Sequence, residues 1–266
     1  DMYPYSTLKV NIESSRNIIR AINEEMKIQE KKDDIIAVYI GSITENGSRM
    51  SPMHWARPGD PVCISPYDHY GVSKAADERI FVEGGLKKWV VIRMSSILHK
   101  NLLNHFEPVI FTVALNSTLE WCTLEDTGRM ISHLVERSFI PDDVDMSINQ
   151  DDRFSVGKYG KLPQTFWCKY YTVGSGSYYR LSNYEFMTLM FESLGLGPIE
   201  YYFEPQWFVT RNFHGHFILN DDIIENYLHY RENLPTRDYF KKLVDQCPFY
   251  FKIPRFIPCK RLLAFF

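Results

Sequence analysis

The stretch Tyr70-Gly71-Val72-Ser73-Lys74 lies between two apolar segments, and the three together predict the fold. The earlier segment, Asp34-Ile35-Ile36-Ala37-Val38-Tyr39-Ile40, contains the continuous apolar run that is typical of a buried parallel strand. The later segment, Trp89-Val90-Val91-Ile92-Arg93-Met94, follows Gly84-Gly85, a signal for the end of a helix. A strand, a helix and a second strand in this order form a parallel crossover unit, so the sequence predicts an α/β fold.

Tyr70 and Lys74 are four residues apart, so on a helix their side chains share one face. A phenol has an ordinary pKa of about 10, and a fixed cation within roughly 4–6 Å favours the phenolate and lowers that pKa. Such a tyrosine can move a proton to or from a substrate hydroxyl. The spacing alone is weak evidence, because Tyr5 and Lys9 share it. The alternative is a solvent-exposed helix face with no catalytic role.

Five landmarks, in order along the chain, resemble the extended short-chain dehydrogenase/reductase family of the NAD-dependent epimerase/dehydratase type. They are Val10-Asn11, Gly41-Ser42, the Tyr70–Lys74 stretch, Arg93-Met94-Ser95-Ser96 and Cys122-Thr123-Leu124-Glu125-Asp126-Thr127-Gly128. The resemblance covers about residues 1–130 and, more loosely, Tyr171-Thr172-Val173-Gly174-Ser175-Gly176, which is similar to a strand and turn in that family's substrate half. It implies a Rossmann-type parallel sheet with a smaller mixed α/β substrate domain. Residues 1–120 would be the C-terminal part of the nucleotide-binding domain, and 121–266 mainly the substrate domain.

The resemblance implies an NAD(P)-dependent oxidoreductase, epimerase or dehydratase that transfers a hydride at a hydroxyl-bearing carbon, in many relatives that of a nucleotide sugar. In that family a Ser or Thr after the strand binds the substrate oxygen, the Tyr is the general acid/base, and the Lys holds the nicotinamide ribose. These residues are Ser42, Tyr70 and Lys74 here, and Thr44 could take the place of Ser42. The cofactor-binding residues that the resemblance implies for NAD or NADP are Tyr70, Lys74, Arg93, Ser95 and Ser96. Relatives commonly dimerise through helices, so a homodimer is expected.

A polar and aromatic loop, Glu204–His216, corresponds to the region that closes over the distal part of the substrate in the resembling family. Arg211 can bind an anionic group with two hydrogen bonds, Trp207 can stack on a ring, and His214 can hydrogen-bond. The alternative is a packed aromatic cluster. A metal site at His214-Gly215-His216 is disfavoured because no third ligand is evident.

The Gly-x-x-Gly-x-x-Gly turn, with which this family holds the pyrophosphate of its cofactor, does not occur in the sequence. We therefore expect the N-terminal cofactor-binding part, with three strands, to be missing from these 266 residues. Asp1–Phe266 alone should then bind NADH weakly. A non-catalytic NAD(P)-binding or regulatory protein of the same fold is the alternative to an enzyme.

Composition restricts the class of protein further. The chain is 45% hydrophobic and 24% charged, as in ordinary globular proteins. A net charge of −3 gives no broad basic field, which argues against a nucleic-acid partner. The apolar runs are shorter than the roughly 20 residues of a membrane-spanning helix, which argues against a membrane protein. Five cysteines without Cys-x-x-Cys or zinc spacing suit reduced thiols and favour a cytoplasmic location.

Helical patterns outside the crossover unit predict further elements. A first helix over about 6–28 has an apolar side formed by Val10, Ile18, Ile22 and Met26. Ser182 and Glu185 form a capping box that begins another helix, and Gly195 marks its end. The segment Pro198–Phe203 is predicted to be a short strand.

Overall fold

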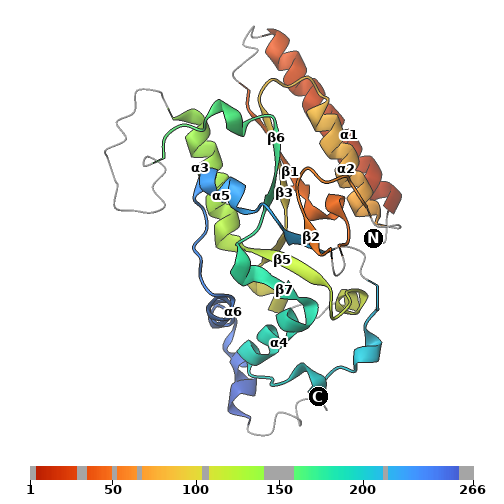
Figure 1. The fold of residues 1–266 in the computed structure, drawn as a ribbon, viewed down its shortest axis with the longest axis vertical. Coiled ribbons are helices and arrows are strands. Elements are labelled where there is room, and N and C mark those ends of the chain that lie inside the picture. Colours follow the sequence, from red (N-terminus) through yellow and green to blue (C-terminus); the bar gives the residue numbers. More distant parts are fainter. Residues whose placement is uncertain are drawn as a thin grey trace.

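The structure is a computed structural model, and it describes residues 4–28, 35–49, 53–64, 68–103, 108–140, 159–211 and 215–257. Its central sheet contains strands β1 (Ala37–Ser42), β3 (Trp89–Met94) and β6 (Lys169–Val173), all parallel and in the order β1-β3-β6. Helix α2 (His69–Val82) connects β1 to β3, so the predicted crossover unit is confirmed (Figure 1). The carboxyl ends of the strands meet at one edge, where Met94 pairs with Ser42 on one side and Val173 on the other.

The middle strand is buried on both faces, as its continuous apolar run predicts. Val90, Val91 and Ile92 have no exposed surface. The first strand begins at Ala37, two residues after the start of the apolar run at Ile35, and continues through Gly41 and Ser42. Its carboxyl end is therefore polar, and it delivers the Ser42 side chain to the edge of the sheet.

Helices α1 (Pro4–Ile28) and α2 cover one face of the sheet. The Asn11 side-chain amide donates to the Ser73 hydroxyl at 2.8 Å and joins the two helices. The predicted apolar side of α1 is partly wrong. Ile19, Ile22 and Met26 pack against the sheet core, whereas Val10 and Ile18 are exposed. The contacting residues are spaced i, i+3 and i+7, so the buried stripe is narrower than the sequence pattern indicated.

The opposite face of the sheet packs against α3 (Leu124–Phe139) and α5 (Asp222–Leu228), and Figure 1 shows these helices across the sheet from α1 and α2. Met130 and Leu134 of α3 and Ile224 of α5 are the main buried contacts. The sheet is thus covered on both faces, which explains why its strands read as apolar runs rather than as alternating patterns.

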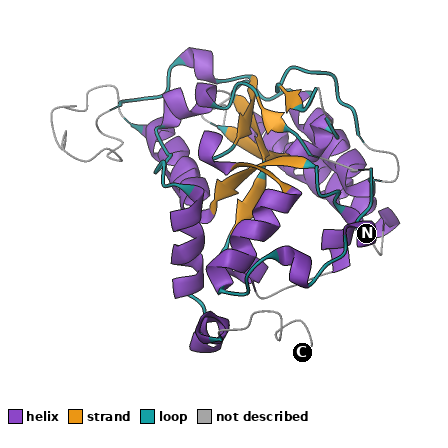
Figure 2. Ribbon diagram, turned by 60° about the horizontal axis from the view of Figure 1, so that its bottom comes forward, coloured by secondary structure: helices purple, strands orange, loops and turns teal. Residues whose placement is uncertain are grey.

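A second sheet lies beyond the carboxyl edge of the first. Strand β5 (Thr118–Thr123) pairs in parallel with β4 (Ser96–Leu98) and antiparallel with β7 (Arg180–Ser182). Helices α4 (Asn183–Leu194) and α6 (Thr236–Asp245) build a separate hydrophobic core with it. A short parallel pair, β2 (Trp55–Ala56) with β8 (Phe217–Ile218), completes the strands of the described residues. In Figure 2 the strands run through the centre with helices around them.

The predictions for the second half of the chain have mixed outcomes. Ser182 and Glu185 form the predicted capping box, and Gly195 ends the helix in a left-handed conformation. The predicted strand at Pro198–Phe203 is wrong, because Ile199–Tyr201 form a 3₁₀ turn in which the Tyr201 N–H donates to the Pro198 carbonyl. The turn places Ile199 in the second core.

Strand β6 lies in the part of the chain that was assigned to the substrate domain, yet it is the third strand of the central sheet. The sheet therefore draws on both predicted parts, 1–120 and 121–266, and the division at residue 120 remains a prediction. Among the described residues, no helix is both long and apolar enough to cross a membrane.

Candidate functional site

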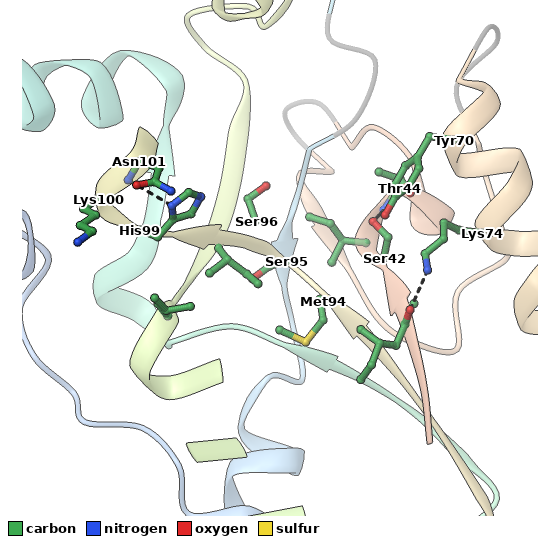
Figure 3. Close-up of a pocket in the computed structure, with 15 residues that line it drawn as sticks. Ser42, Thr44, Tyr70, Lys74, Met94, Ser95, Ser96, His99, Lys100 and Asn101 are labelled. Carbon is green, nitrogen blue, oxygen red and sulfur yellow. Dashed lines mark hydrogen bonds between the residues drawn. The ribbon is translucent and has the colours of Figure 1, made fainter. Parts of the chain in front are cut away.

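A cavity of about 780 Å³ opens at the carboxyl ends of β1 and β3. Its wall includes six of the residues predicted from the sequence: Ser42, Thr44, Tyr70, Lys74, Ser95 and Ser96 (Figure 3). Ser42 ends β1 and Thr44 lies in the turn after it. Tyr70 and Lys74 come from α2, Ser95 lies between β3 and β4, and Ser96 begins β4. Ligands of open α/β sheets bind at this edge, outside the carboxyl ends of the strands.

The 3₁₀ turn Ile43–Asn46 sets the orientation of Ser42. Ser42 caps this turn: its hydroxyl accepts a hydrogen bond from the Thr44 N–H at 3.3 Å, and its own N–H donates to Glu45 Oε1 at 3.2 Å. Because Ser42 Oγ accepts in this bond, its proton remains available to a second acceptor.

Tyr70 is the residue to which that proton can go. The pKa of the Tyr70 phenol is raised, chiefly by burial; a hydrogen bond with Ser42 lowers it, and the carboxylates of Glu45 and Asp68 raise it. The raised pKa differs from the sequence prediction that Lys74 lowers it. Burial is the largest cause of the rise. The Lys74 ammonium donates to the Ile40 carbonyl at 2.8 Å and lies 4.9 Å from the centre of the Tyr39 ring.

Two hydroxyl groups of the wall have no hydrogen-bond partner in the described structure. They are Thr44 Oγ1 and Ser95 Oγ, both buried. Buried polar atoms are almost always hydrogen-bonded in native proteins, so an unpaired hydroxyl in a cavity wall suits a ligand with polar groups. Each hydroxyl can donate and accept a hydrogen bond, as the predicted contacts with a nicotinamide cofactor require.

Arg93, the remaining predicted cofactor-binding residue, is separated from the others. Its side chain is buried and does not line the cavity. Its guanidinium forms ion pairs with Glu78 and Glu45, with nitrogen–oxygen distances of 2.7 Å to each carboxylate. These contacts give Arg93 a structural role, joining α2 and the turn after β1 to β3.

The predicted substrate loop lies elsewhere. Trp207 is half exposed, and its ring packs edge-on against Phe111 and Phe203, as the aromatic-cluster alternative describes. Neither Trp207 nor the exposed Arg211 lines the cavity, and His214 lies outside the described residues. Their roles in substrate binding remain predictions.

The cavity also has a wall that the sequence reading missed. His99, Lys100 and Asn101 lie at its other end, opposite Tyr70 and Lys74 (Figure 3). The Asn101 N–H donates to His99 Nδ1 at 3.2 Å and fixes the turn. Their position directly after β4, the short strand that follows β3 along the chain, is the signal that could have identified them. No carboxylate occurs among the described residues of the wall.

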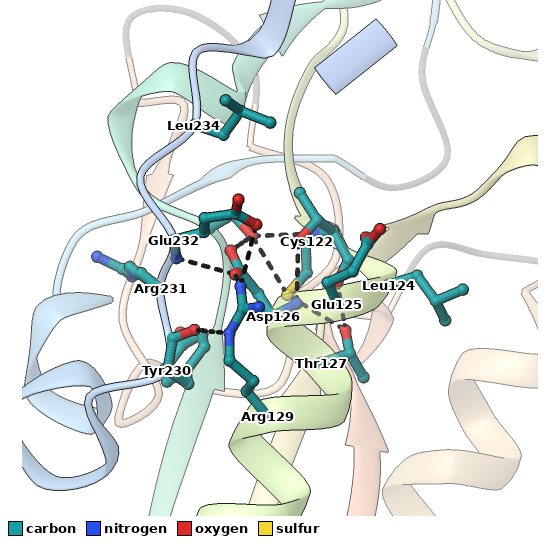
Figure 4. Close-up of polar contacts among 12 residues, drawn as sticks. Cys122, Leu124, Glu125, Asp126, Thr127, Arg129, Tyr230, Arg231, Glu232 and Leu234 are labelled. Carbon is teal, nitrogen blue, oxygen red and sulfur yellow. Dashed lines mark hydrogen bonds and ion pairs between the residues drawn. The ribbon is translucent and has the colours of Figure 1, made fainter. Parts of the chain in front are cut away.

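A second polar cluster holds the start of α3 in place (Figure 4). Asp126 accepts from the Ser175 hydroxyl at 2.6 Å and from the Glu232 N–H at 3.0 Å. The Thr127 hydroxyl donates to Cys122 Sγ at 3.3 Å. Burial raises the pKa of Cys122 to about 11, so the thiol stays protonated and is no nucleophile. This cluster is structural and joins β5, α3 and the chain after β6.

No protein-family model and no curated protein matches the sequence, but solved structures match the fold. A dTDP-glucose 4,6-dehydratase from Bacillus anthracis, in complex with NAD, is similar at a TM-score of 0.58 and 13% identity, over 92% of this chain and 69% of that one. A UDP-glucuronic acid 4-epimerase from Bacillus cereus, in complex with NAD, is similar at a TM-score of 0.55 and 12% identity, over 92% of this chain and 68% of that one. MoeE5, in complex with UDP-glucuronic acid and NAD, has a TM-score of 0.56 and 12% identity, over 89% of this chain and 71% of that one.

Each match spans nearly all of this chain but only about 70% of the neighbour. At 12–13% identity the likeness concerns the fold. These neighbours include a dehydratase and an epimerase solved with NAD, and this chain shares their Rossmann-type α/β fold.

Proposed function

We propose that this protein is an NAD(P)-dependent oxidoreductase, epimerase or dehydratase that acts at a hydroxyl-bearing carbon through Ser42, Tyr70 and Lys74. One observation carries the proposal: side chains from β1, α2 and the segment after β3 line a single cavity at the carboxyl edge of the sheet. The unpaired hydroxyls of Thr44 and Ser95 in the same wall support a polar ligand there.

A bound nicotinamide would supply the hydride acceptor or donor. Tyr70 moves the proton at the substrate hydroxyl oxygen, Ser42 holds that oxygen, and Lys74 binds the ribose hydroxyls. Because its pKa is raised, the Tyr70 phenol is protonated at neutral pH and is ready to act as an acid. To act as a base it needs a nearer cation, which Lys74 can provide by leaving the Ile40 carbonyl.

The substrate class that we propose is a nucleotide sugar. The charged groups of the cavity wall are Lys74 and Lys100, without a described carboxylate, and this balance favours an anionic ligand. Among the neighbours, MoeE5 was solved with UDP-glucuronic acid.

The proposal is tested by measuring the turnover of UDP- and dTDP-linked hexoses with NAD or NADP. NADH absorbance reports the change in the cofactor, and NMR identifies the sugar product. Tyr70→Phe removes the titrating oxygen, so turnover should fall by about 10²–10⁴ while the fold persists. Tyr5→Phe is the matched control, because Tyr5 has the same spacing to a lysine but is exposed on α1. Full activity of Tyr70→Phe would refute the assignment. Cofactor binding without turnover of any substrate would favour a non-catalytic binding protein.

A further inference from the structure

Beneath the cavity, two carboxyl groups share one guanidinium. Glu45, Glu78 and Arg93 are all buried, with exposed side-chain fractions of 0%, 7% and 3%. Arg93 Nη2 lies 2.7 Å from Glu78 Oε1, and Arg93 Nε lies 2.9 Å from Glu78 Oε2 and 2.7 Å from Glu45 Oε2. If both carboxyls were ionised, the cluster would hold two negative charges against one positive charge.

The hydrogen-bond geometry shows which oxygen lacks a donor. Arg93 Nε carries a single hydrogen, which it donates to Glu78 Oε2, and Nη1 donates to Asn46 Oδ1 and to the Pro58 carbonyl. Glu45 Oε2 receives no hydrogen bond from the residues that the structure describes, although it is completely buried. An ionised oxygen in that position would be costly, whereas a proton on it could be donated to Glu78.

We propose that Glu45 and Glu78 share one proton above Arg93, and that Glu45 in this form is a positioning residue for the Ser42–Tyr70 pair. The positioning role rests on the proposed function, but the shared proton does not.

The connection to the site runs through the turn after β1. Glu45 Oε1 accepts the Ser42 N–H, and Ser42 Oγ accepts the Thr44 N–H, so the carboxyl group fixes the residue that donates to Tyr70. Gly41 leaves room for this carboxyl, since a Cβ there would lie 3.1 Å from Glu45 Oε1.

The groups around Glu45 determine whether its pKa is raised or lowered. The ionisable side chains that face Glu45 are Tyr39 of β1, Tyr70 and Glu78 of α2, Arg93 of β3 and Tyr170 of β6. Burial raises the pKa of Glu45 well above 4.5, Glu78 raises it further, and Arg93 opposes the rise. Burial alone would raise the pKa of Glu78, but hydrogen bonds from Arg93 and Glu45 lower it below its ordinary value. The three tyrosines have pKa values raised above 10.0, so Glu45 is the group of this cluster that titrates between pH 4.5 and pH 10.

Urea unfolding between pH 5.5 and pH 8.5 tests the shared proton. Glu45→Gln keeps the size and both hydrogen bonds of the protonated acid but cannot ionise. Because the folded state raises the pKa of Glu45, the wild type should lose stability relative to Glu45→Gln as the pH rises. The ratio of their folding constants should fall by up to about tenfold per pH unit. The exposed Glu83→Gln, whose carboxylate pairs with Arg79, is the control and should give a constant ratio.

A constant or rising ratio for Glu45→Gln would overturn the shared proton. If that variant does not fold, Glu78→Gln serves in its place. Without the Glu78 charge, one cause of the raised pKa of Glu45 is lost while burial remains, so the loss of stability at high pH should become smaller; an unchanged loss would overturn the inference.

The positioning role is tested by the ionisation of Tyr70, which needs no substrate. The ultraviolet difference spectrum between each protein and its Tyr70→Phe form isolates the phenolate of this residue. Glu45→Gln and Glu45→Met both remove the charge, but only Glu45→Gln keeps the acceptor for the Ser42 N–H. Because the hydrogen bond with Ser42 lowers the pKa of Tyr70, that pKa should be higher in Glu45→Met than in Glu45→Gln, whereas Glu83→Gln should leave the wild-type value unchanged. Equal pKa values in Glu45→Met and Glu45→Gln would refute the positioning role. Because neither measurement uses turnover, an inactive protein that passes both would refute only the proposed function.

Discussion

Among single residues, Arg93 and Arg79 form ion pairs that differ in their burial. Arg93 is buried between two carboxyl groups, whereas Arg79 forms an exposed pair with Glu83 one helical turn away. Removing one partner of a buried pair leaves an uncompensated charge away from water, but an exposed charge is solvated whether or not it is paired.

Arg93→Met should therefore destabilise the protein by about 3–5 kcal/mol at pH 7, while Arg79→Met should cost at most about 1 kcal/mol. Without the guanidinium, both buried carboxyls have raised pKa values, so the loss for Arg93→Met should be smaller at pH 5 than at pH 7. Urea unfolding at the two pH values measures both effects. Equal losses for the two variants would show that the cluster is solvated.

The residue scale also shows what sequence reasoning could reach. Ser42, Tyr70 and Lys74 could be predicted, because each follows from a local pattern: the end of an apolar run, or a four-residue spacing on a helix. Glu45 could not, since its partners Glu78 and Arg93 lie far along the chain and only the folded sheet brings them together. Long-range contacts of this kind leave no local signature.

At the scale of elements, the C-terminus of α4 depends on Gly195. This residue has φ of +77°, and a Cβ there would lie 2.8 Å from the Arg255 Cα and 2.9 Å from its N. Gly85, after α2, has the same φ, but a Cβ there would meet nothing within 4 Å. A side chain at either position would therefore strain the backbone, but only at Gly195 would its Cβ also clash with another residue.

Gly85→Ala should cost about 1–2 kcal/mol, the penalty of a left-handed conformation for a residue with a Cβ. Gly195→Ala should cost clearly more, because the 3₁₀ segment Phe249–Phe256 would have to move. Thermal and urea unfolding of the two variants measure the difference. Equal costs would mean that this segment does not pack against the end of α4.

The elements predicted correctly are those whose signals lie within a few residues. The capping box of Ser182 and Glu185 is one, because the side chain and the backbone groups that it binds are neighbours in sequence. The segment Pro198–Phe203 is the counterexample. Its apolar and aromatic residues suit a strand, but the second core takes Ile199 inward and the chain closes into a turn.

In the whole molecule, β1 is an edge strand of the described sheet, and two of its apolar side chains are partly exposed. Among the described strands β1 pairs only with β3, and the side chains of Val38 and Ile40 are 38% and 40% exposed. Exposed apolar edge strands promote association between chains.

Val38→Lys should therefore increase the concentration at which the protein remains monodisperse, with little change in its unfolding free energy. Light scattering and urea unfolding measure the two quantities. Val90→Lys is the contrasting variant, because Val90 has no exposed surface and a charge there should prevent folding. If Val38→Lys associates at the same concentration as the wild type, another surface causes the association.

In the whole molecule, the cavity at the carboxyl edge should take the nicotinamide-ribose end of a dinucleotide. Saturation-transfer NMR of NADH tests it most directly, because the method detects weak binding and reports which ligand protons touch the protein. We predict strong transfer to the nicotinamide-ribose protons with the wild type, its loss with Lys74→Met, and no change with the exposed Lys9→Met. Transfer mainly to the adenine protons, or equal transfer in the wild type and Lys74→Met, would contradict the account.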